Sequence, residues 1–427
     1  MPLFSATSIW NQPLAADAPL APDSAAIVGY LNSFVSSSEA AQTGPWINTT
    51  SYSAPIYTAP AGQATEPVYL DASDADDTLQ GALSAVPIPA GALPAAGSDA
   101  EMIVYQPSSD EMWELWGLHQ SLTAPRYVWA GAATGGEFAP GTYSYTVTAL
   151  SASGETTVSP SVTVTVAAGQ DASIGWVGVP GAIGYRVYRS SAGVGRQLVG
   201  TVTHTSTTFD KLGFTDTGAE APGAGAPTSN TAATPGQWHA GWGGRILDVS
   251  SDPGYYQNVY SAGQLVEESD WGATASSLPL AGGLITLADL ASGQIDHAIA
   301  MLVPKAAAGV YWCPASRTDG YDTAADAIPE GAHFRLNPAL NLNAISMPPI
   351  TRMIAVAAQR YGLIVNDQTG ATVGFRAQDP TPLMRAGQSD PYARYFVGSN
   401  GQSELPTRLL ASFPWSQLRL LAPPSCS

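Results

Sequence analysis

Glycine and proline interrupt this chain so often that long helices have little room to form. The 427 residues include 43 glycines and 34 prolines, spread between short apolar runs. Short strands bounded by turn residues are typical of all-β proteins, because Gly and Pro end regular structure and supply the turns. We therefore predict a mainly β protein: a β-sandwich or jelly-roll-like host domain with one or two packed helices, plus a second β-sandwich inserted into it.

The clearest strand pattern lies within residues 135–227, which are rich in Thr, Val, Ser and Gly and alternate with period two. Such alternation indicates strands with one buried face. We predict strands at 141–149, 161–166, 172–176, 184–189 and 214–217. Short strands at this spacing are typical of a small β-sandwich.

Gly/Ala-rich seams at 130–136 and 218–227 flank this predicted module. After it, the chain again has short apolar runs between Gly and Pro turns. Surface loops tolerate long insertions at low entropic cost. We therefore predict a discontinuous host domain, residues 1–130 plus 230–427, with the sandwich at 135–227 inserted. The two ends of such an insertion are expected to meet.

The host sequence predicts two helices and several short strands. The helices are expected at 24–36 and 350–361, where apolar residues follow helical spacing. Strands are expected at 67–70, 102–105, 112–116, 244–249, 283–286, 295–303, 333–336, 363–365 and 371–375.

The charge balance excludes several partners. Lys and Arg number 16 against 34 Asp and Glu, a net charge of −18. A field of that sign repels phosphate backbones and anionic lipids, so we expect neither nucleic acid nor a membrane surface as a partner. No apolar run is long enough to span a bilayer, and the N-terminal sequence does not resemble a signal peptide.

Metal and disulfide signals are sparse. The two cysteines, Cys313 and Cys426, allow one disulfide or two thiols, and the spacing of Cys and His excludes a structural zinc site. We predict no cofactor. The acidic turn with Asp71, Asp74, Asp76 and Asp77 lacks the glycine and terminal glutamate of an EF-hand loop. It is therefore expected to be solvated, with calcium as the less favoured alternative.

The segment 113–119, Trp-Glu-Leu-Trp-Gly-Leu-His, is the strongest local signal for chemistry. On a strand, Glu114 and Trp116 share a face, and a carboxylate beside an indole suits a sugar. Asp99 and Glu101 lie one strand earlier and could complete the carboxylate pair that a glycosidase needs. The alternative is a half-buried edge strand whose glutamate is solvated.

A second aromatic cluster follows the predicted insertion. If the two ends of the insertion meet, this cluster is expected near Trp113, Trp116 and His119 and could form a glycan-binding surface. The alternative is an aromatic seam that seals the sandwich against its host. The residues after the insertion are Trp238, His239, Trp242, Arg245, Asp248, Tyr255 and Tyr256.

Two weaker signals complete the candidates. His297 is expected on a strand face with Ile295 and Ile299, where a buried core histidine is favoured over a general base. The loop with Arg317 and Asp319 could clamp an acidic sugar. If the protein is an enzyme, the candidate catalytic residues are Glu114, Asp99, His239 and His297.

Two resemblances add to these patterns. The stretch from Trp176 to Arg189 resembles a strand pair of fibronectin type III domains, although here the 143–156 hairpin precedes that pair instead of following it. Residues 8–14, 22–27, 293–300, 328–336 and 352–365 resemble a family of large β-rich proteins found on actinobacterial surfaces and in the tails of their phages. That family implies no activity, so no catalytic residue follows from it.

Three functions remain open at this point. The resemblance favours a phage minor tail or receptor-binding protein in the virion, facing an actinobacterial envelope glycan. Its expected partners are a cell-surface polysaccharide and other tail proteins, and it could be a homo-oligomer, a trimer by analogy. The alternatives are a polysaccharide-degrading hydrolase or lyase and a purely structural tail component.

Overall fold

The chain forms two compact units, and its regular structure is mainly β, as predicted. The computed structural model describes residues 3–49, 51–71, 76–191, 193–206, 209–221, 223–261 and 264–424. Unit 1 comprises Met1–Thr65, Pro87–Gly117 and Gly243–Ser427, and unit 2 comprises Glu66–Val86 and Leu118–Trp242. Among the described residues, no helix combines the length and apolar character needed to cross a membrane.

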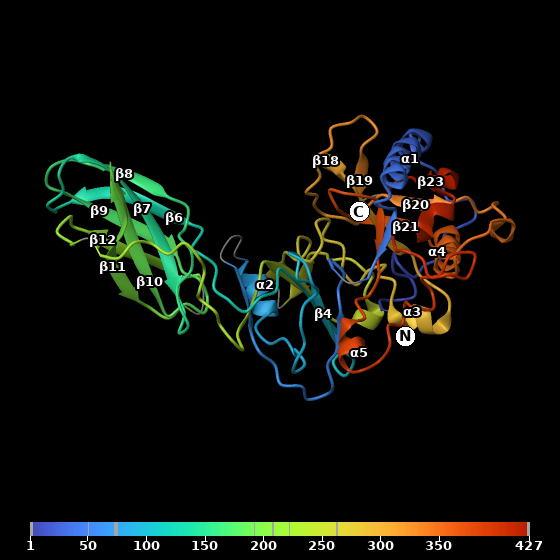
Figure 1. Cartoon of the computed structure of the whole chain (residues 1–427), viewed down its shortest axis with the longest axis horizontal. Coiled ribbons are helices and arrows are strands. Elements are labelled where there is room, and N and C mark those ends of the chain that lie inside the picture. The colour runs from blue at the N-terminus through green and yellow to red at the C-terminus, as the bar shows by residue number, and fades with distance from the viewer. Residues whose placement is uncertain are drawn as a thin grey trace. The chain divides into compact units, whose positions relative to one another are not determined.

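Most of unit 2 is a sandwich of two antiparallel sheets (Figure 1). Four strands pair in the order β11-β10-β7-β8 and three in the order β12-β9-β6. Both sheets contribute to one core around Tyr145, Trp176 and Tyr185. The strands are β6 Val128–Thr134, β7 Gly141–Leu150, β8 Val162–Val166, β9 Gln170–Val177, β10 Gly184–Ser191, β11 Val194–Thr203 and β12 Lys211–Asp216.

The first of these strands corrects the sequence prediction. Residues 130–136, predicted to be a Gly/Ala-rich seam, contribute most of β6. Trp129 pairs with Gly175 of β9, and its indole fills the space that a side chain at Gly175 would occupy. The aromatic ring thus compensates for a glycine in a strand, where packing is otherwise lost.

The remainder of unit 2 lies where the chain enters and leaves the sandwich. Strands β3 (Val68–Leu70) and β13 (Trp238–Ala240) pair in parallel, and helix α2 (Asp77–Ala82) follows β3. Backbone bridges join His119 to His239 and Ser121 to Ala233. The segments that precede and follow the sandwich therefore lie side by side around these bridges.

Unit 1 is organised around a six-stranded mixed sheet. Helices α1 (Ser24–Ala41) and α4 (Pro349–Arg360) lie beside it (Figure 1) and contribute Leu31 and Ile354 to its core. The strand order is β1 (Trp46–Asn48), β22 (Gly374–Arg376), β17 (Ile299–Val303), β21 (Leu363–Gln368), β20 (His333–Leu336) and β23 (Leu418–Leu420).

A second sheet of unit 1 has the order β14 (Trp242–Ile246), β5 (Glu111–Trp116), β4 (Met102–Gln106) and β2 (Ile56–Thr58). The strand carrying Glu114 is therefore central and not an edge strand. The shorter elements are α3 Leu287–Ser292, α5 Thr381–Arg385, the pairs β15 Val259–Ser261 with β16 Gln264–Val266 and β18 Ala306–Tyr311 with β19 Ile328–Glu330, and 3-10 turns at Val249–Ser251, Leu342–Ala344, Leu409–Ser412 and Trp415–Gln417.

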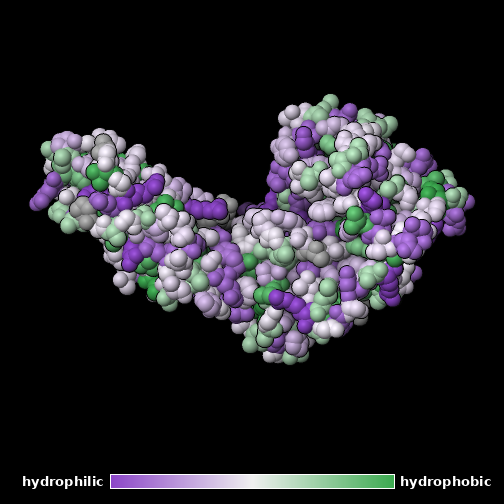
Figure 2. Space-filling view, in the orientation of Figure 1, coloured by the Kyte–Doolittle hydropathy of each residue, from purple (hydrophilic) through white to green (hydrophobic). Residues whose placement is uncertain are grey.

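The surface is polar with scattered apolar side chains. On the face shown in Figure 2, apolar residues form small patches between polar ones. Single exposed apolar residues are ordinary on globular proteins. Aromatic side chains among the exposed residues include Tyr52, Trp116, Tyr127, Trp129, Tyr311 and Tyr321.

Candidate functional site

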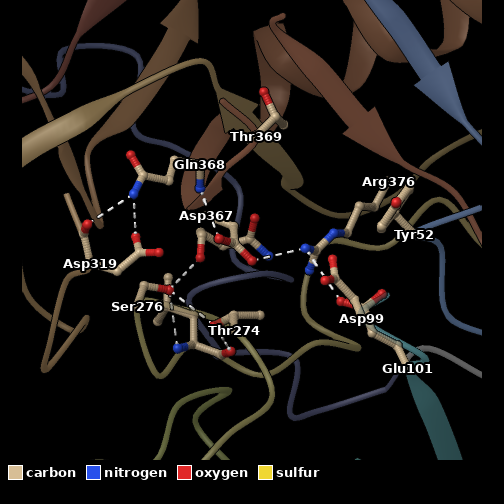
Figure 3. A network of polar contacts seen from close by, with 12 residues as sticks. Tyr52, Asp99, Glu101, Thr274, Ser276, Asp319, Asp367, Gln368, Thr369 and Arg376 are labelled. Carbon is tan, nitrogen blue, oxygen red and sulfur yellow. Dashed lines mark hydrogen bonds and ion pairs between the residues drawn. The ribbon is translucent and has the colours of Figure 1, made fainter. Parts of the chain in front are cut away.

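Five carboxylates gather in unit 1 around one arginine. We call this group the acidic centre; Figure 3 shows most of it in one polar network. Its members come from the turn before β4, the loop before β19 and the ends of β19, β21 and β22. They are Asp99, Glu101, Asp319, Glu330, Asp367 and Arg376.

A β-bulge places Asp367. Along β21, Val365 pairs with Met301 of β17, but Leu302 pairs with Asp367, so Asn366 is an extra residue. A bulge of this kind re-aims the side chains that follow it. Asp367 accepts hydrogen bonds from Arg376 Nη2 and from the backbone N–H of Gln368, each at 2.8 Å.

Glu330 is the buried member of the acidic centre. It ends β19, and its backbone oxygen accepts a hydrogen bond from the Trp312 N–H at 2.7 Å. Its side chain is fully buried, and neither carboxylate oxygen has a hydrogen-bond partner of regular geometry among the described residues. Burial raises the pKa of Glu330 to about 8; Asp367 and Asp319 add to that rise, while the Thr318 side chain and Arg317 oppose it.

Asp319 is the exposed member, held in place by its neighbour on β21. Gln368 Nε2 donates to the backbone oxygen of Asp319 at 2.9 Å and to its Oδ1 at 2.8 Å (Figure 3). One oxygen from each of Asp319, Glu330 and Asp367 lies within 4.8 Å of the others. Two surface-accessible carboxylates and one buried carboxylate thus converge on one point.

Asp99 and Glu101 occupy one turn but different environments. Asp99 is partly exposed, and its backbone oxygen accepts a hydrogen bond from the Gly117 N–H at 2.6 Å. Glu101 is buried, with Oε1 3.4 Å from Arg376 Nη2. Burial raises the pKa of Glu101 to about 7, against the lowering effect of Arg376. Ala100 between them has φ of 41°, the left-handed region, and such strain is concentrated at functional sites.

Two half-exposed aromatic side chains flank this turn. The backbone N–H of Tyr52 donates to Ala96, and the Tyr52 ring packs against Gly97. Trp116 ends β5 directly before Gly117, which holds the Asp99 turn. Each ring is 40% exposed. Aromatic rings next to carboxylates suit sugars, whose apolar faces stack on rings while their hydroxyls bind acids.

Glu114 has neither of the environments predicted from the sequence. Its carboxylate is fully buried, whereas Trp116 is exposed. It accepts hydrogen bonds from the Ala281 N–H at 2.9 Å and the Tyr256 hydroxyl at 3.3 Å. Burial raises its pKa to about 7, although these hydrogen bonds lower it. Glu114 therefore holds the chain near Ala281 in place.

The predicted catalytic histidines have other partners. His239 belongs to unit 2, where it is fully buried and stacks on His119 with ring centroids 5.6 Å apart. His297 lies before β17 and not on a strand face; its Nε2 is 3.1 Å from Asp289 Oδ2. Of the four predicted catalytic residues, Asp99 is the one that belongs to the acidic centre.

Most of the predicted glycan-binding aromatics are packed inside. Trp113, Trp238 and Tyr256 are buried, and His119, Trp242, Arg245 and Tyr255 are partly buried. Trp116 is the exposed aromatic residue of the set. Asp248 is exposed.

Arg317 does not present a free guanidinium to an acidic sugar. Its Nε and Nη2 donate to the backbone oxygens of Ala275, Gly272 and Thr274 at 3.3, 3.1 and 2.8 Å, and Nη1 donates to the Asp270 oxygen. Arg317 therefore cross-links the 270–275 loop.

The acidic turn of unit 2 is partly described. Asp71 accepts hydrogen bonds from His119 at 3.2 Å and Thr123 at 3.3 Å, and Asp76 caps α2. Asp77 begins that helix, and Asp74 lies outside the described residues. Cys313 is disulfide-bonded, and Cys426 lies outside the described residues.

An open groove of about 420 Å³ lies elsewhere in unit 1, between the start of α1 and the β18–β19 region. Two carboxylates, Asp23 and Asp322, line it, and Asp322 accepts a hydrogen bond from the Tyr30 hydroxyl at 2.7 Å. The rest of the lining is mainly alanine and other apolar residues. The groove therefore lacks the charged network of the acidic centre.

No protein-family model matches the chain, and no curated protein matches it. A function for the chain must therefore be argued from the acidic centre and the side chains around it.

Proposed function

We propose that this protein cleaves a polysaccharide of a bacterial cell envelope by acid–base catalysis. The observation that carries the proposal is the pair of carboxylates in one turn, Asp99 partly exposed and Glu101 buried beside Arg376. Glycosidases use two carboxyl groups in different environments. The difference keeps one of them protonated as the acid and the other ionised as the base or nucleophile.

The chemistry assigns one role to each residue. Burial raises the pKa of Glu101 to about 7, against the lowering effect of Arg376, so a proton on this carboxyl is less costly at neutral pH than on an exposed glutamate. Glu101 gives that proton to the glycosidic oxygen as its bond to the anomeric carbon breaks. Asp99 has one of two roles. It either deprotonates the water that attacks the anomeric carbon, or it attacks that carbon itself as the nucleophile.

The substrate class is supported by the surroundings of the turn. Tyr52 and Trp116 present half-exposed rings beside Asp99, and rings of this kind stack on sugars. The choice of an envelope glycan follows the resemblance to actinobacterial surface and phage-tail proteins. A tail protein that degrades the envelope would combine the two functions.

The test is a turnover assay on the full chain. Envelope polysaccharides from several actinobacteria are incubated with the protein, and reducing and unsaturated ends are measured in the same samples. We expect reducing ends from the wild type and a loss of about 10²–10⁴-fold in Glu101→Gln and in Asp99→Asn. Glu111→Gln, in the same sheet but outside the acidic centre, should retain activity.

Wild-type turnover in both variants, each shown by circular dichroism to be folded, would eliminate this assignment. Unsaturated instead of reducing ends would replace hydrolysis by a lyase reaction. Asp99→Asn is the safer variant, because Asp99 is partly exposed while Glu101 forms a buried ion pair.

We propose attachment to the same glycan as a second function, supported by two aromatics of unit 2. Tyr127 and Trp129 are 48% and 47% exposed and lie two positions apart at the edge strand β6, so they face one side. Trp129→Ala should weaken binding to immobilised polysaccharide, and Tyr311→Ala in unit 1 should not. A role in a phage tail, with other tail proteins and as a homo-oligomer, rests on the resemblance alone.

A further inference from the structure

We propose that Asp319, Glu330 and Asp367 form a binding site for one divalent cation, and that this cation is calcium. The site is distinct from the Asp99–Glu101 pair to which we assign acid–base catalysis. Arg376 connects the cation site to that pair, because it donates a hydrogen bond to Asp367 and forms an ion pair with Glu101.

The spacing of the three carboxylates matches a common ion. One oxygen from each residue lies within 4.8 Å of the other two. Calcium binds oxygen ligands at about 2.3–2.6 Å, so oxygens on opposite sides of one ion can be separated by that much. A single cation can therefore contact all three groups without large movement of the backbone.

An independent observation comes from the buried side chain of Glu330. It is fully buried, and neither of its oxygens has a hydrogen-bond partner of regular geometry among the described residues. Buried polar groups in native proteins nearly always have partners, because leaving them without one is costly. Glu330 points into the Asp319–Asp367 pair, so a cation there supplies the missing partner.

The other two ligands are held in position. Gln368 bonds to both the backbone and the side chain of Asp319. Asp367 is held by Arg376 and by the N–H of Gln368. Ligands fixed in this way lose little conformational freedom when an ion binds.

The local charge also favours a cation. The acidic centre has five carboxylates, and its guanidinium, Arg376, bonds to Glu101 and Asp367. The guanidinium of nearby Arg317 donates to backbone carbonyls, and its charge offsets part of the negative charge of Glu330 and Asp319. Three carboxylates without nitrogen or sulfur ligands suit a hard ion. Calcium tolerates an irregular oxygen set better than magnesium, which requires near-octahedral geometry.

The test is isothermal titration of the full chain with calcium chloride after chelator treatment, with magnesium chloride in parallel. We expect one calcium per chain and at least tenfold weaker binding in Asp319→Asn and in Glu330→Gln. Asp326→Asn serves as the control, because Asp326 lies in the same loop but outside the cluster; its affinity should equal that of the wild type. Calcium should also raise the unfolding temperature of the wild type.

Absence of calcium binding at millimolar concentration, or equal binding by the wild type and Asp319→Asn, would overturn the site. Binding of magnesium without calcium would overturn the choice of ion. Because Asp319 is exposed, its variant keeps the test valid if Glu330→Gln fails to fold. The readout is heat of binding and not turnover, so failure of the cation site and failure of glycan cleavage are separate results.

Discussion

His297 Nε2 lies 3.1 Å from Asp289 Oδ2, and the same oxygen accepts hydrogen bonds from the backbone N–H and the hydroxyl of Thr286. Thr286 and Asp289 form the capping box of helix α3. His297 Nδ1 is 2.8 Å from the Ala298 oxygen. Both ring nitrogens therefore face acceptors, which favours the protonated imidazolium.

The first prediction concerns this histidine and the pH dependence of stability. Burial, the largest single effect, would lower the pKa of His297, but the hydrogen bond and charge of Asp289, together with the Ala298 oxygen and Asp296, outweigh it and raise the pKa. Its stabilisation is therefore fully present below the unfolded pKa of about 6.5 and is lost as pH rises through the folded pKa. His297→Gln should cost about 2 kcal/mol of unfolding free energy at pH 5 and less at pH 9. Denaturant unfolding at both pH values measures this.

The matched control is His333→Gln. His333 Nε2 lies 2.9 Å from the Tyr361 oxygen, and burial lowers the pKa of His333 to about 4. The stabilisation by the neutral His333 ring is lost as pH falls. His333→Gln should therefore lower the unfolding free energy more at pH 9 than at pH 5. The same trend for both variants would contradict the assignment of the His297–Asp289 ion pair.

The second prediction concerns His239 in unit 2. Neither ring nitrogen has a hydrogen-bond partner among the described residues, and burial, aided by the charge of His119, lowers the pKa of His239 to about 4. Stability from the neutral ring is lost as pH falls from about 6.5 through that value. His239→Phe should therefore be near wild type at pH 7 and more resistant to acid, with a difference approaching about 3 kcal/mol near pH 4. An unchanged acid unfolding midpoint would contradict this.

The third prediction concerns Arg317. Its guanidinium donates to four backbone oxygens between residues 270 and 275, and a lysine ammonium cannot reproduce that fork. Arg317→Lys should lower the unfolding free energy by about 3 kcal/mol. Arg360→Lys is the control, because Arg360 is exposed and its ion pair with Asp296 is long, 3.5 Å. Equal thermal midpoints for the two variants would show that Arg317 has no such role.

The fourth prediction concerns the strained turn between Asp99 and Glu101. Ala100 has a left-handed φ of 41°, which costs a non-glycine residue roughly 1 kcal/mol. Ala100→Gly should raise or preserve the unfolding free energy while lowering glycan turnover, because the turn becomes less rigid. Ala96→Gly, without a positive φ, should be destabilising by about 0.5–1 kcal/mol. A stability loss in Ala100→Gly equal to that of Ala96→Gly would argue against strain.

The sequence predicted regular elements well where one local period dominated. The period-two pattern at 141–149 corresponds to β7 at Gly141–Leu150, and the helical spacing at 350–361 corresponds to α4 at Pro349–Arg360. Elsewhere the prediction was wrong: 283–286, predicted as a strand, is irregular apart from one isolated bridge at Ile285. Strand β11 was missed because Gly195 and Gly200 break its alternation.

Half of the acidic centre, Glu330, Asp367 and Arg376, was missed in the sequence for a physical reason. Glu330 and Asp367 are each single acidic residues at the ends of short buried strands, and they meet only through the pairing of distant segments. Neither forms a motif. The usable signal was the abrupt change from buried apolar to polar residues at Asn366-Asp-Gln and at Glu330. Asp99 and Glu101 were recognisable because they lie beside a strand with a strong pattern.

The backbone bridges His119–His239 and Ser121–Ala233 have an evolutionary consequence. The chain leaves for the sandwich and returns from it through adjacent, antiparallel segments. Any other module with closely spaced ends can be joined at the same two positions without changing the residues that pair there. The coding segment between residues 122 and 232 can thus be exchanged or lost by recombination, and related chains should differ by whole modules at this point while the acidic centre is retained.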